Sequence, residues 1–456
     1  MSRLFIATWG SPIEWDNVNY VVEPLSESES LSPVESCTTL IPLLEYFCSS
    51  GDCDITIVVL DSLIDLPSPR SRQVRDSSCT ICCEGNRRIL NNEWRSYIDL
   101  RRSVEEFVKE VVKCLGIKRE IRVIVAPAIG SPGGNRRFNG KARDFEAVVL
   151  YELGKLVLDK NYDEIILDLT HGINFMPSLT LRVAYRLASL LLLAHKELGE
   201  VKLLVYNSDP YKRARAIEER IIPEIRINLV VKDIVKNIQL VHRIPSPVKQ
   251  VRKPSDTVID RVKKLVDEYF EAVRSAYSAL YYPLPLALAT TVNNAKSPLE
   301  IMDKIIELWL ETIEVGDRVV NRILSLNPDA LYLLLLVEAT RRRLQGIVEY
   351  PTSIKTLKEI AEVYSAINQS YHPLITIEIG QLEKKLSVIT TNNWVRYCDL
   401  YEEKCKDVKT PDKRIMIAHA GLQKEIVEVH PSGLVRYTGR VEEILRSSGL
   451  LLECEM

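Results

Sequence analysis

Short apolar runs alternate with amphipathic segments over the first half of the chain. Each run is followed by polar or small residues, at Arg3–Thr8, Ile55–Leu60, Ile121–Ala126, Glu164–Leu167 and Lys202–Val205. Segments with helical spacing separate these runs, at Thr38–Cys48, Arg101–Leu115, Phe145–Asp159 and Phe175–Lys196. Strands that alternate with helices predict an α/β domain in which a parallel sheet carries helices on both faces.

The second half of the chain has a different texture. Proline-containing segments, Pro245-Ser246-Pro247 and Lys253-Pro254-Ser255, punctuate the chain as a linker does. Beyond them apolar residues recur at helical spacing, in Ile259–Ala276, Pro298–Ile313, Val319–Leu326, Ala330–Arg343 and Lys355–Asn368. We therefore predict an α/β domain over residues 1–235, a linker over 236–254 and an all-α domain over 255–456. The all-α domain has a small β-hairpin at His430 and room for an inserted subdomain near 340–410.

Charge and hydropathy narrow the class of protein. The chain has 456 residues and a formal net charge of -2, so no overall basic field attracts long nucleic acid. The longest apolar runs, Leu187–Ala194 and Leu331–Val337, are too short to span a bilayer, and no secretory signal opens the chain. We expect a cytoplasmic protein that has no membrane partner.

The 10 cysteines are scattered along the chain. Cys79, Cys82 and Cys83 contain a lone Cys-x-x-Cys, whereas a structural zinc needs a second pair at a comparable spacing. Cys398 and Cys405 could pair in space, and disulfides remain possible. We predict no metal site and no cofactor.

The most informative stretch is the loop from Asp168 to Asn174 (DLTHGIN). It follows a buried strand and precedes a long apolar helix, so its backbone N–H groups can face an anion. The alternative is a polar loop that only caps the helix, through Thr170 or Asn174.

Other strand ends strengthen the first interpretation. In an open parallel sheet the ligand lies at the carboxyl edge of the strands, where this chain gathers small residues, hydroxyls and amides. Asp61, Ser62 and the basic residue Arg136 also follow strands. No glycine-rich dinucleotide turn or phosphate-binding loop of the usual kind occurs. A metal held by Asp61 and Asp168 lacks further ligands.

A second informative stretch runs from Thr410 to Gly421 (TPDKRIMIAHAG). Thr410 is a good N-cap, Pro411 suits the first helical position and Gly421 suits the position after a helix, so we predict a short helix. It carries Arg414 and His419, which are about 140° apart around the helix axis.

This pair has the chemistry of RNA cleavage without a metal. A histidine can move the proton of the 2′-OH, and an arginine matches the oxygens of the phosphorane. The expected products carry a 2′,3′-cyclic phosphate and a 5′-OH. Two copies of the helix across a twofold axis would complete the site. The alternative is a packing helix with Arg414 in a surface ion pair and His419 in the core.

Together these segments resemble the CARF–HEPN ribonucleases that accompany type III CRISPR systems, over most of the chain. The marks are residues 4–12 (LFIATWGSP) with Trp15, Val18 and Tyr20, then 59–63 (VLDSL), 168–174, 206–210 (YNSDP) and 414–422 (RIMIAHAGL). The resemblance implies a Rossmann-like CARF sensor that dimerises and binds a cyclic oligoadenylate, usually the tetra-adenylate. It also implies a helical HEPN ribonuclease whose site needs two protomers of a homodimer or of a higher assembly.

Site residues follow from the same resemblance. Arg414 and His419 would be the catalytic pair. The ligand would contact Thr8, Trp9, Gly10, Ser11, Thr170, His171, Gly172, Asn174, Asn207 and Ser208, to which the strand ends add Asp61, Ser62 and Arg136. Ile415 stands where this family often has a polar residue such as asparagine. This departure bears on the rate of RNA cleavage more than on the type of reaction.

The expected function is metal-independent cleavage of single-stranded RNA, activated by a cyclic oligoadenylate, in antiviral defence. One alternative is a ligand-sensing transcription regulator, whose recognition helix would need the run Arg341-Arg342-Arg343. That run is otherwise a solvated helix face or a patch that guides RNA. A second alternative is an α/β domain that itself cuts the cyclic nucleotide.

Overall fold

The computed structural model describes residues 2–49, 52–65, 77–91, 94–210, 222–293, 297–401, 405 and 411–455. Its first half contains an eight-stranded sheet with the order β3-β2-β9-β8-β7-β1-β4-β5. Five of these strands run parallel: β1 (Ser2–Trp9), β4 (Asp52–Leu60), β5 (Ile121–Ala126), β7 (Glu164–Asp168) and β8 (Val201–Ser208). They are the five predicted strands, and their predicted parallel arrangement is confirmed.

The sheet as a whole is mixed, which corrects the expectation of a purely parallel sheet. β9 (Glu224–Val235) returns antiparallel to β8, and β2 (Val18–Val22) pairs parallel with β9. β3 (Val34–Ser36) closes this edge antiparallel to β2. Much of β9 alternates partly buried with exposed positions, as in a strand with one solvated face, and not as in a strand covered on both faces.

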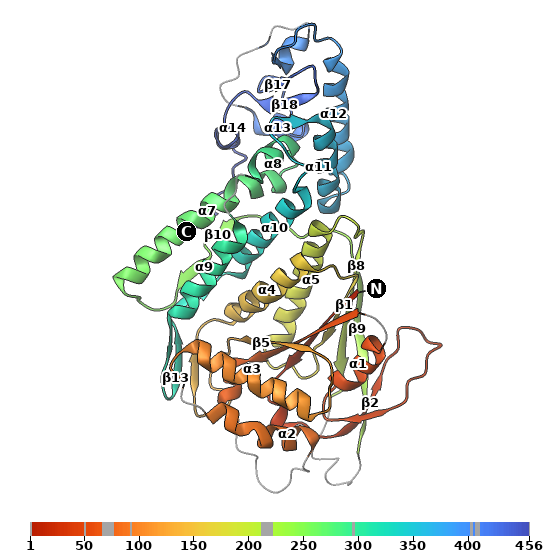
Figure 1. The fold of residues 1–456 in the computed structure, drawn as a ribbon, viewed down its shortest axis with the longest axis vertical. Helices are drawn as coiled ribbons and strands as arrows, with labels where there is room; N and C mark the ends of the chain where they lie inside the picture. Colours follow the sequence, from red (N-terminus) through yellow and green to blue (C-terminus); the bar gives the residue numbers. More distant parts are fainter. Residues whose placement is uncertain are drawn as a thin grey trace.

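Helices cover both faces of the sheet, as predicted. α1 (Leu40–Cys48) and α3 (Tyr97–Cys114) lie on one face, and α4 (Ala142–Asp159) and α5 (Met176–Ala194) pack side by side on the other (Figure 1). This division follows from right-handed crossovers, because the strand order reverses direction after β5.

One described helix, α5, is long and apolar enough to cross a membrane by length and composition alone. It is longer than the apolar runs considered in the sequence. However, 67% of its apolar window is buried inside the protein. The sheet lies on one side of α5, and α10 (Pro328–Leu344) lies on another. Burial on several sides therefore explains the apolar surface of α5.

The predicted linker is built into the fold. β10 (Ile244–Pro245) pairs with the C-terminal β19 (Cys454–Glu455), and β11 (Val248–Gln250) pairs with β14 (Leu324–Leu326). The apolar helix α10 packs on α4 and α5. The division into residues 1–235, 236–254 and 255–456 remains a prediction, but its parts are in firm contact.

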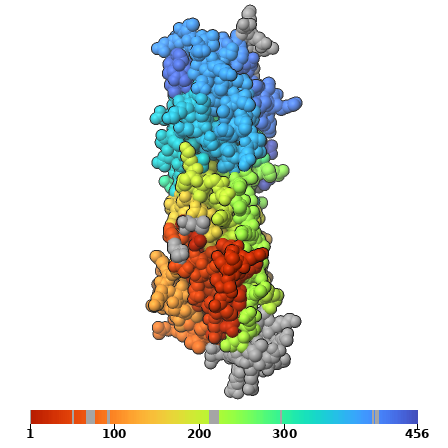
Figure 2. Space-filling view, turned by 90° about the vertical axis from the view of Figure 1, so that its right-hand side faces the viewer, coloured from red at the N-terminus to blue at the C-terminus, as the bar shows by residue number. Residues whose placement is uncertain are grey.

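The C-terminal half is stacked on the N-terminal half along the long axis of the molecule (Figure 2). Besides α10 it contains α7 (Asp256–Tyr281), α8 (Pro285–Thr291), α9 (Pro298–Glu311), α11 (Ile354–Ile367), α12 (Tyr371–Leu386), α13 (Lys413–Ala418) and α14 (Val441–Ser447). The expectation of an all-α domain with one small hairpin is wrong. The predicted hairpin at His430 is present, between β17 (Val427–Val429) and β18 (Leu434–Tyr437). It belongs to a four-stranded sheet with β15 (Thr352–Ser353) and β16 (Val395–Arg396).

The segment 319–326, predicted to be helical, forms strands instead. β12 (Ile313–Val315) and β13 (Val319–Arg322) make a hairpin, and β14 follows. β13 also pairs with β6 (Arg137–Asn139), which lies in the loop after β5. The sequence VVNRILSL is rich in β-branched and apolar residues, and the pairing of β13 with β6, a distant part of the same chain, favours strands. The hairpin thus attaches the C-terminal half to the sheet.

Disulfides attach the described part of the segment between β4 and α3 to the rest of the fold. α2 (Ser78–Asn86) is bonded through Cys79 to Cys37 and through Cys82 to Cys114 of α3. Further disulfides join Cys48 to Cys53 and Cys398 to Cys405. In this structure the two thiols of the lone Cys-x-x-Cys are bonded to Cys37 and Cys114.

Candidate functional site

The carboxyl ends of β1, β4, β7 and β8, with the loops that follow them, form a polar surface that we call the crest. Trp15 lies at its centre and stacks on His171, with ring centroids 3.8 Å apart and an interplanar angle of 23°. The backbone N–H of Gly10 donates to the carbonyl oxygen of His171 at 2.7 Å, which binds the loop after β1 to the loop after β7.

Two cavities share Trp15 on the crest. One, of about 470 Å³, is lined among others by Gly10, Ser11 and Ser62. The other, of about 330 Å³, is lined by Thr170, His171, Asn207 and Ser208. Seven of the predicted ligand-binding residues therefore face two adjacent cavities. Ser208 is held there because its N–H donates to Oγ1 of Thr170 at 3.1 Å.

Three predicted ligand residues are corrected by the structure. Thr8 and Trp9 are 1% and 0% exposed, because helices cover both faces of β1 and every side chain near its end is buried. Asp61 is 0% exposed and accepts hydrogen bonds from the Tyr97 hydroxyl and the N–H of Ala128. These three side chains belong to the core behind the crest and line neither cavity.

Two other predicted residues shape the loop without lining either cavity. A Cβ on Gly172 would come within 2.5 Å of Oγ1 of Thr8, so only glycine lets the loop pack this closely on β1. Asn174 is exposed at a φ of 52°, a left-handed conformation that asparagine tolerates well.

His171 is a neutral imidazole in this loop. Burial lowers its pKa to about 3, so it carries no charge near neutral pH. The N–H of Thr39 donates to its Nε2 at 3.3 Å, which assigns the proton to Nδ1. With Trp15, His171 therefore offers a ligand a flat, uncharged stacking surface.

Arg136 lies in a neighbouring cavity of about 540 Å³, together with Arg87, Arg318 and Asp65. Its guanidinium lies 4.9 Å from the centroid of the Trp94 ring, and Nη1 donates to the carbonyl oxygen of Gly316 in the β12–β13 hairpin at 3.3 Å. Arg136 thus lies next to the β12–β13 hairpin, beside the two crest cavities and not within either of them.

The second predicted site lies on α13, far from the crest along the long axis (Figure 1). Thr410, the predicted N-cap, is outside the described residues. Asp412 is the N-cap that the structure shows, because its side chain accepts from the N–H groups of Arg414 and Ile415 at 2.8 and 3.1 Å. The helix is shorter than predicted and ends at Ala418, so His419 is its C-cap.

The end of α13 is a Schellman motif. The N–H of Gly421 donates to Met416 at 2.7 Å, and the N–H of Ala420 donates to Ile417 at 3.2 Å. Ala420 takes the left-handed position with a φ of 48°, where glycine is usual. Gly421 follows with a φ of 74°, so the predicted glycine stop is present one residue later.

Both predicted catalytic side chains are open to solvent. Arg414 is exposed, and within the described ranges its guanidinium has neither a hydrogen bond nor an ion pair. The side chain of His419 is 49% exposed, and its Nδ1 lies 3.0 Å from Oε2 of Glu378 on α12. Exposure excludes a core histidine, and no described residue forms an ion pair with Arg414.

Comparisons with known proteins agree with these two sites. Residues 4–210 match the family model described as the CARF domain of CRISPR system endoribonuclease Csx1, and residues 368–438 match the model of its HEPN domain. The CRISPR system endoribonuclease Csx1 of Methanocaldococcus jannaschii is 26% identical over 475 aligned residues, which cover 97% of this chain and 89% of that protein. The chain belongs to the CARF–HEPN endoribonuclease family of CRISPR systems.

The matched HEPN range is narrower than the predicted domain. It extends from α12 to β18 and contains Glu378, Arg414 and His419. The helices α7 to α11 lie between the two matched ranges. In this chain they form the layer that carries the HEPN site on the CARF domain.

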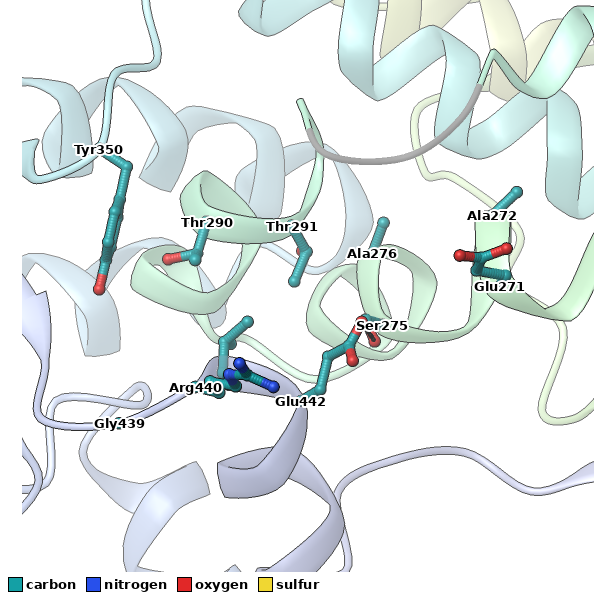
Figure 3. A pocket seen from close by; sticks show the side chains of 11 residues that line it. Glu271, Ala272, Ser275, Ala276, Thr290, Thr291, Tyr350, Gly439, Arg440 and Glu442 are labelled. Carbon is teal, nitrogen blue, oxygen red and sulfur yellow. Dashed lines mark hydrogen bonds between the residues drawn. The ribbon is translucent and has the colours of Figure 1, made fainter. Parts of the chain in front are cut away.

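Another cavity of the C-terminal half, of about 380 Å³, lies between α7, α8 and the start of α14 (Figure 3). Its lining includes Arg440, Glu271 and Glu442. None of its lining residues is a predicted site residue, so we assign no ligand to this cavity.

Sequence reasoning missed two functional residues. Trp15 was noted only as a mark of the family, although an aromatic residue soon after a strand end could have suggested a stacking surface. Glu378 gave no signal, because 41 residues separate it from His419. Only the packing of α12 beside α13 brings the two together.

Proposed function

We propose that this protein is a cytoplasmic, metal-independent endoribonuclease that cleaves single-stranded RNA in type III CRISPR defence when a cyclic oligoadenylate binds its crest. The observation that carries this proposal is the solvent-exposed pair of Arg414 and His419 within the matched HEPN range. Such a pair provides a proton acceptor and a permanent cation, which are the two groups that RNA self-cleavage needs.

The chemistry is a transesterification. Nε2 of His419 accepts the proton of the 2′-OH while this oxygen attacks the adjacent phosphorus. The guanidinium of Arg414 stabilises the charge that develops on the phosphorane oxygens. The P–O5′ bond breaks and the leaving oxygen takes a proton from solvent, to which His419 releases its own, so one fragment ends in a 2′,3′-cyclic phosphate and the other begins with a 5′-OH.

A twofold pair of α13 helices would complete this site. Arg414 and His419 occupy opposite ends of a six-residue helix, and no described residue pairs with the arginine. Ile415 on the same helix is 43% exposed, and Ile377 beside Glu378 is 59% exposed. Exposed apolar side chains next to a free cation favour a contact with a second copy of the chain. This contact also gives a role to Ile415, where the family often has a polar residue.

The crest suits a cyclic oligoadenylate. Adenine bases can stack on the neutral Trp15–His171 pair, while hydroxyl and amide groups of Thr170, Asn207 and Ser208 hydrogen-bond to ribose and phosphate. A symmetric tetra-adenylate would bridge two crests across the dimer axis. It can activate the nuclease only through a difference in its affinity for the active and inactive arrangements.

The basic run Arg341–Arg343 does not support a DNA-binding regulator. Arg341 and Arg342 pair with Glu338, and Arg343 donates to the carbonyl oxygen of Leu192 at 3.2 Å. The Arg343 contact, together with the bond from Arg342 to the carbonyl oxygen of Leu158 at 2.8 Å, ties α10 to α5 and α4, which argues against a recognition surface or an RNA guide. Cleavage of the cyclic nucleotide by the CARF domain remains open.

End-group analysis and mass measurement test the proposal. RNA fragments made in the presence of cyclic tetra-adenylate should carry 2′,3′-cyclic phosphates, and the active species should be a dimer or a multiple of a dimer. Fragments with 3′-OH ends, or an active monomer, would contradict the mechanism. Incubation of the activator with the protein, followed by a search for linear product, tests whether the CARF domain also cuts the ring.

A further inference from the structure

We propose that Glu378 is a positioning residue of the nuclease site, which holds the imidazole of His419 so that Nε2 faces the RNA. This inference deepens the proposed function and rests on it. The contact joins two separate elements, because Glu378 lies in the middle of α12 and His419 caps α13. Its length, 3.0 Å between Nδ1 and Oε2, is that of a direct hydrogen bond.

The carboxylate is much better fixed than the imidazole. The side chain of Glu378 is 13% exposed, against 49% for His419. Its neighbours on α12, Ile375 and Ile379, are each 0% exposed and anchor this part of the helix in the core. The better-buried carboxylate therefore sets the orientation of the more exposed imidazole.

Tyr397 provides a second observation on the surroundings of the Glu378 carboxylate. The phenol of Tyr397 is buried and accepts a hydrogen bond from the Tyr401 hydroxyl at 3.0 Å. Burial mainly raises the pKa of Tyr397, with the Tyr401 hydrogen bond and the nearby charge of Glu378 adding to the effect. The charge of Glu378 is thus felt by a buried phenol, while its carboxylate contacts the exposed imidazole.

A carboxylate at Nδ1 decides which nitrogen can react. Nδ1 keeps its proton to donate to Oε2, so the lone pair remains on Nε2, which points away from Glu378 across the ring. Nε2 is then the atom that accepts the proton of the 2′-OH. The carboxylate also stabilises the imidazolium that forms in this step, without taking the proton itself.

The chain contains a matched control on the neighbouring helices. His372 on α12 and Glu362 on α11 also lie 3.0 Å apart, but the side chains are 36% and 54% exposed. This pair has the same chemistry and a more exposed carboxylate, and within the described residues no contact joins it to Arg414 or His419. Loss of a histidine–glutamate contact as such can therefore be separated from loss of the contact at the site.

The test compares steady-state RNA cleavage by four variants of the full-length protein with saturating cyclic tetra-adenylate. Glu378→Ala should lower kcat about 10- to 100-fold, as loss of a group that orients a reacting histidine does, with KM within about twofold of the wild type. Glu378→Gln, which keeps an acceptor of the same size but not the charge, should fall between Glu378→Ala and the wild type. Glu362→Gln should retain the wild-type rate, and His419→Ala should be inactive.

The outcomes separate the two proposals. Full activity in Glu378→Ala beside an inactive His419→Ala would overturn the role of Glu378 and leave the nuclease site standing. A loss of kcat that is accompanied by a lowered melting temperature in both Glu378→Ala and Glu378→Gln would mark a structural role and would overturn it too. Activity in His419→Ala would overturn the proposed site and this inference together.

Discussion

Replacement of Arg322 by methionine tests how the two halves of the protein are joined. Arg322 on β13 and Asp61 after β4 form an ion pair in which both side chains are 0% exposed. The guanidinium also donates to the carbonyl oxygen of Ala128 at 2.7 Å, and Arg322 is fully buried at the end of β13. Arg322→Met would leave the carboxylate of Asp61 in the core without its cation.

The expected cost is large because a buried charge loses its partner. Breaking a buried pair on one side typically costs about 3–5 kcal/mol. Burial already raises the pKa of Asp61, and the attraction of Arg322 opposes this rise. Asp61→Asn/Arg322→Met should cost less than Arg322→Met alone, because no unpaired charge remains. We expect an interaction free energy of about 2 kcal/mol or more in this double-mutant cycle.

Urea unfolding followed by circular dichroism measures these changes. Arg261 and Glu311 provide the matched control, since they are 54% and 56% exposed at a distance of 2.7 Å, and Arg261→Met should cost less than about 1 kcal/mol. Equal unfolding midpoints for Arg322→Met and Arg261→Met would refute the reasoning. So would a double variant that is less stable than Arg322→Met.

Three further predictions concern stability. Burial lowers the pKa of His171 to about 3, below the value of about 6.5 in the unfolded chain. Its contribution to stability is therefore present above pH 6.5 and is lost as the pH falls toward 3. The melting temperature of His171→Gln should vary less over this window than that of the wild type, and an identical pH dependence would contradict the assignment. Ala420→Gly should stabilise the protein by about 1 kcal/mol, because it relieves a left-handed φ of 48°, whereas Ala418→Gly inside α13 should destabilise it; a lower melting temperature for Ala420→Gly would count against the cap. Reduction of the disulfides that close spans of 42 and 32 residues should lower the stability of the CARF domain by about 3–4 kcal/mol each, and an unchanged melting temperature in dithiothreitol would argue that they do not hold α2.

The sequence predicted the elements whose signal is local. The runs at Arg3–Thr8 and Ile55–Leu60 are apolar on both faces of a strand, as a sheet covered by helices on both sides requires. In the Thr410–Gly421 segment, the types of residue at the two ends predicted a helix. Arg414 and His419 could be predicted as a catalytic pair because their chemistry and spacing lie within this one segment.

Long-range contacts account for what the sequence did not show. Asp61 was placed at the ligand edge, but Arg322, which is 261 residues away, draws it into the core. Residues 319–326 have an apolar pattern that fits a helix, and the pairing of β13 with β6 makes the first part of this segment a strand. No local pattern contains such partners.

The account depends most on the claim that His419 cleaves RNA under the control of the crest. The direct measurement is cleavage of a fluorogenic single-stranded RNA by the wild type and by His419→Ala, each with and without cyclic tetra-adenylate, in excess EDTA. We predict cleavage by the wild type only when the activator is present, and none by His419→Ala. Cleavage that survives in His419→Ala, that is lost only because of EDTA, or that ignores the activator would contradict the claim.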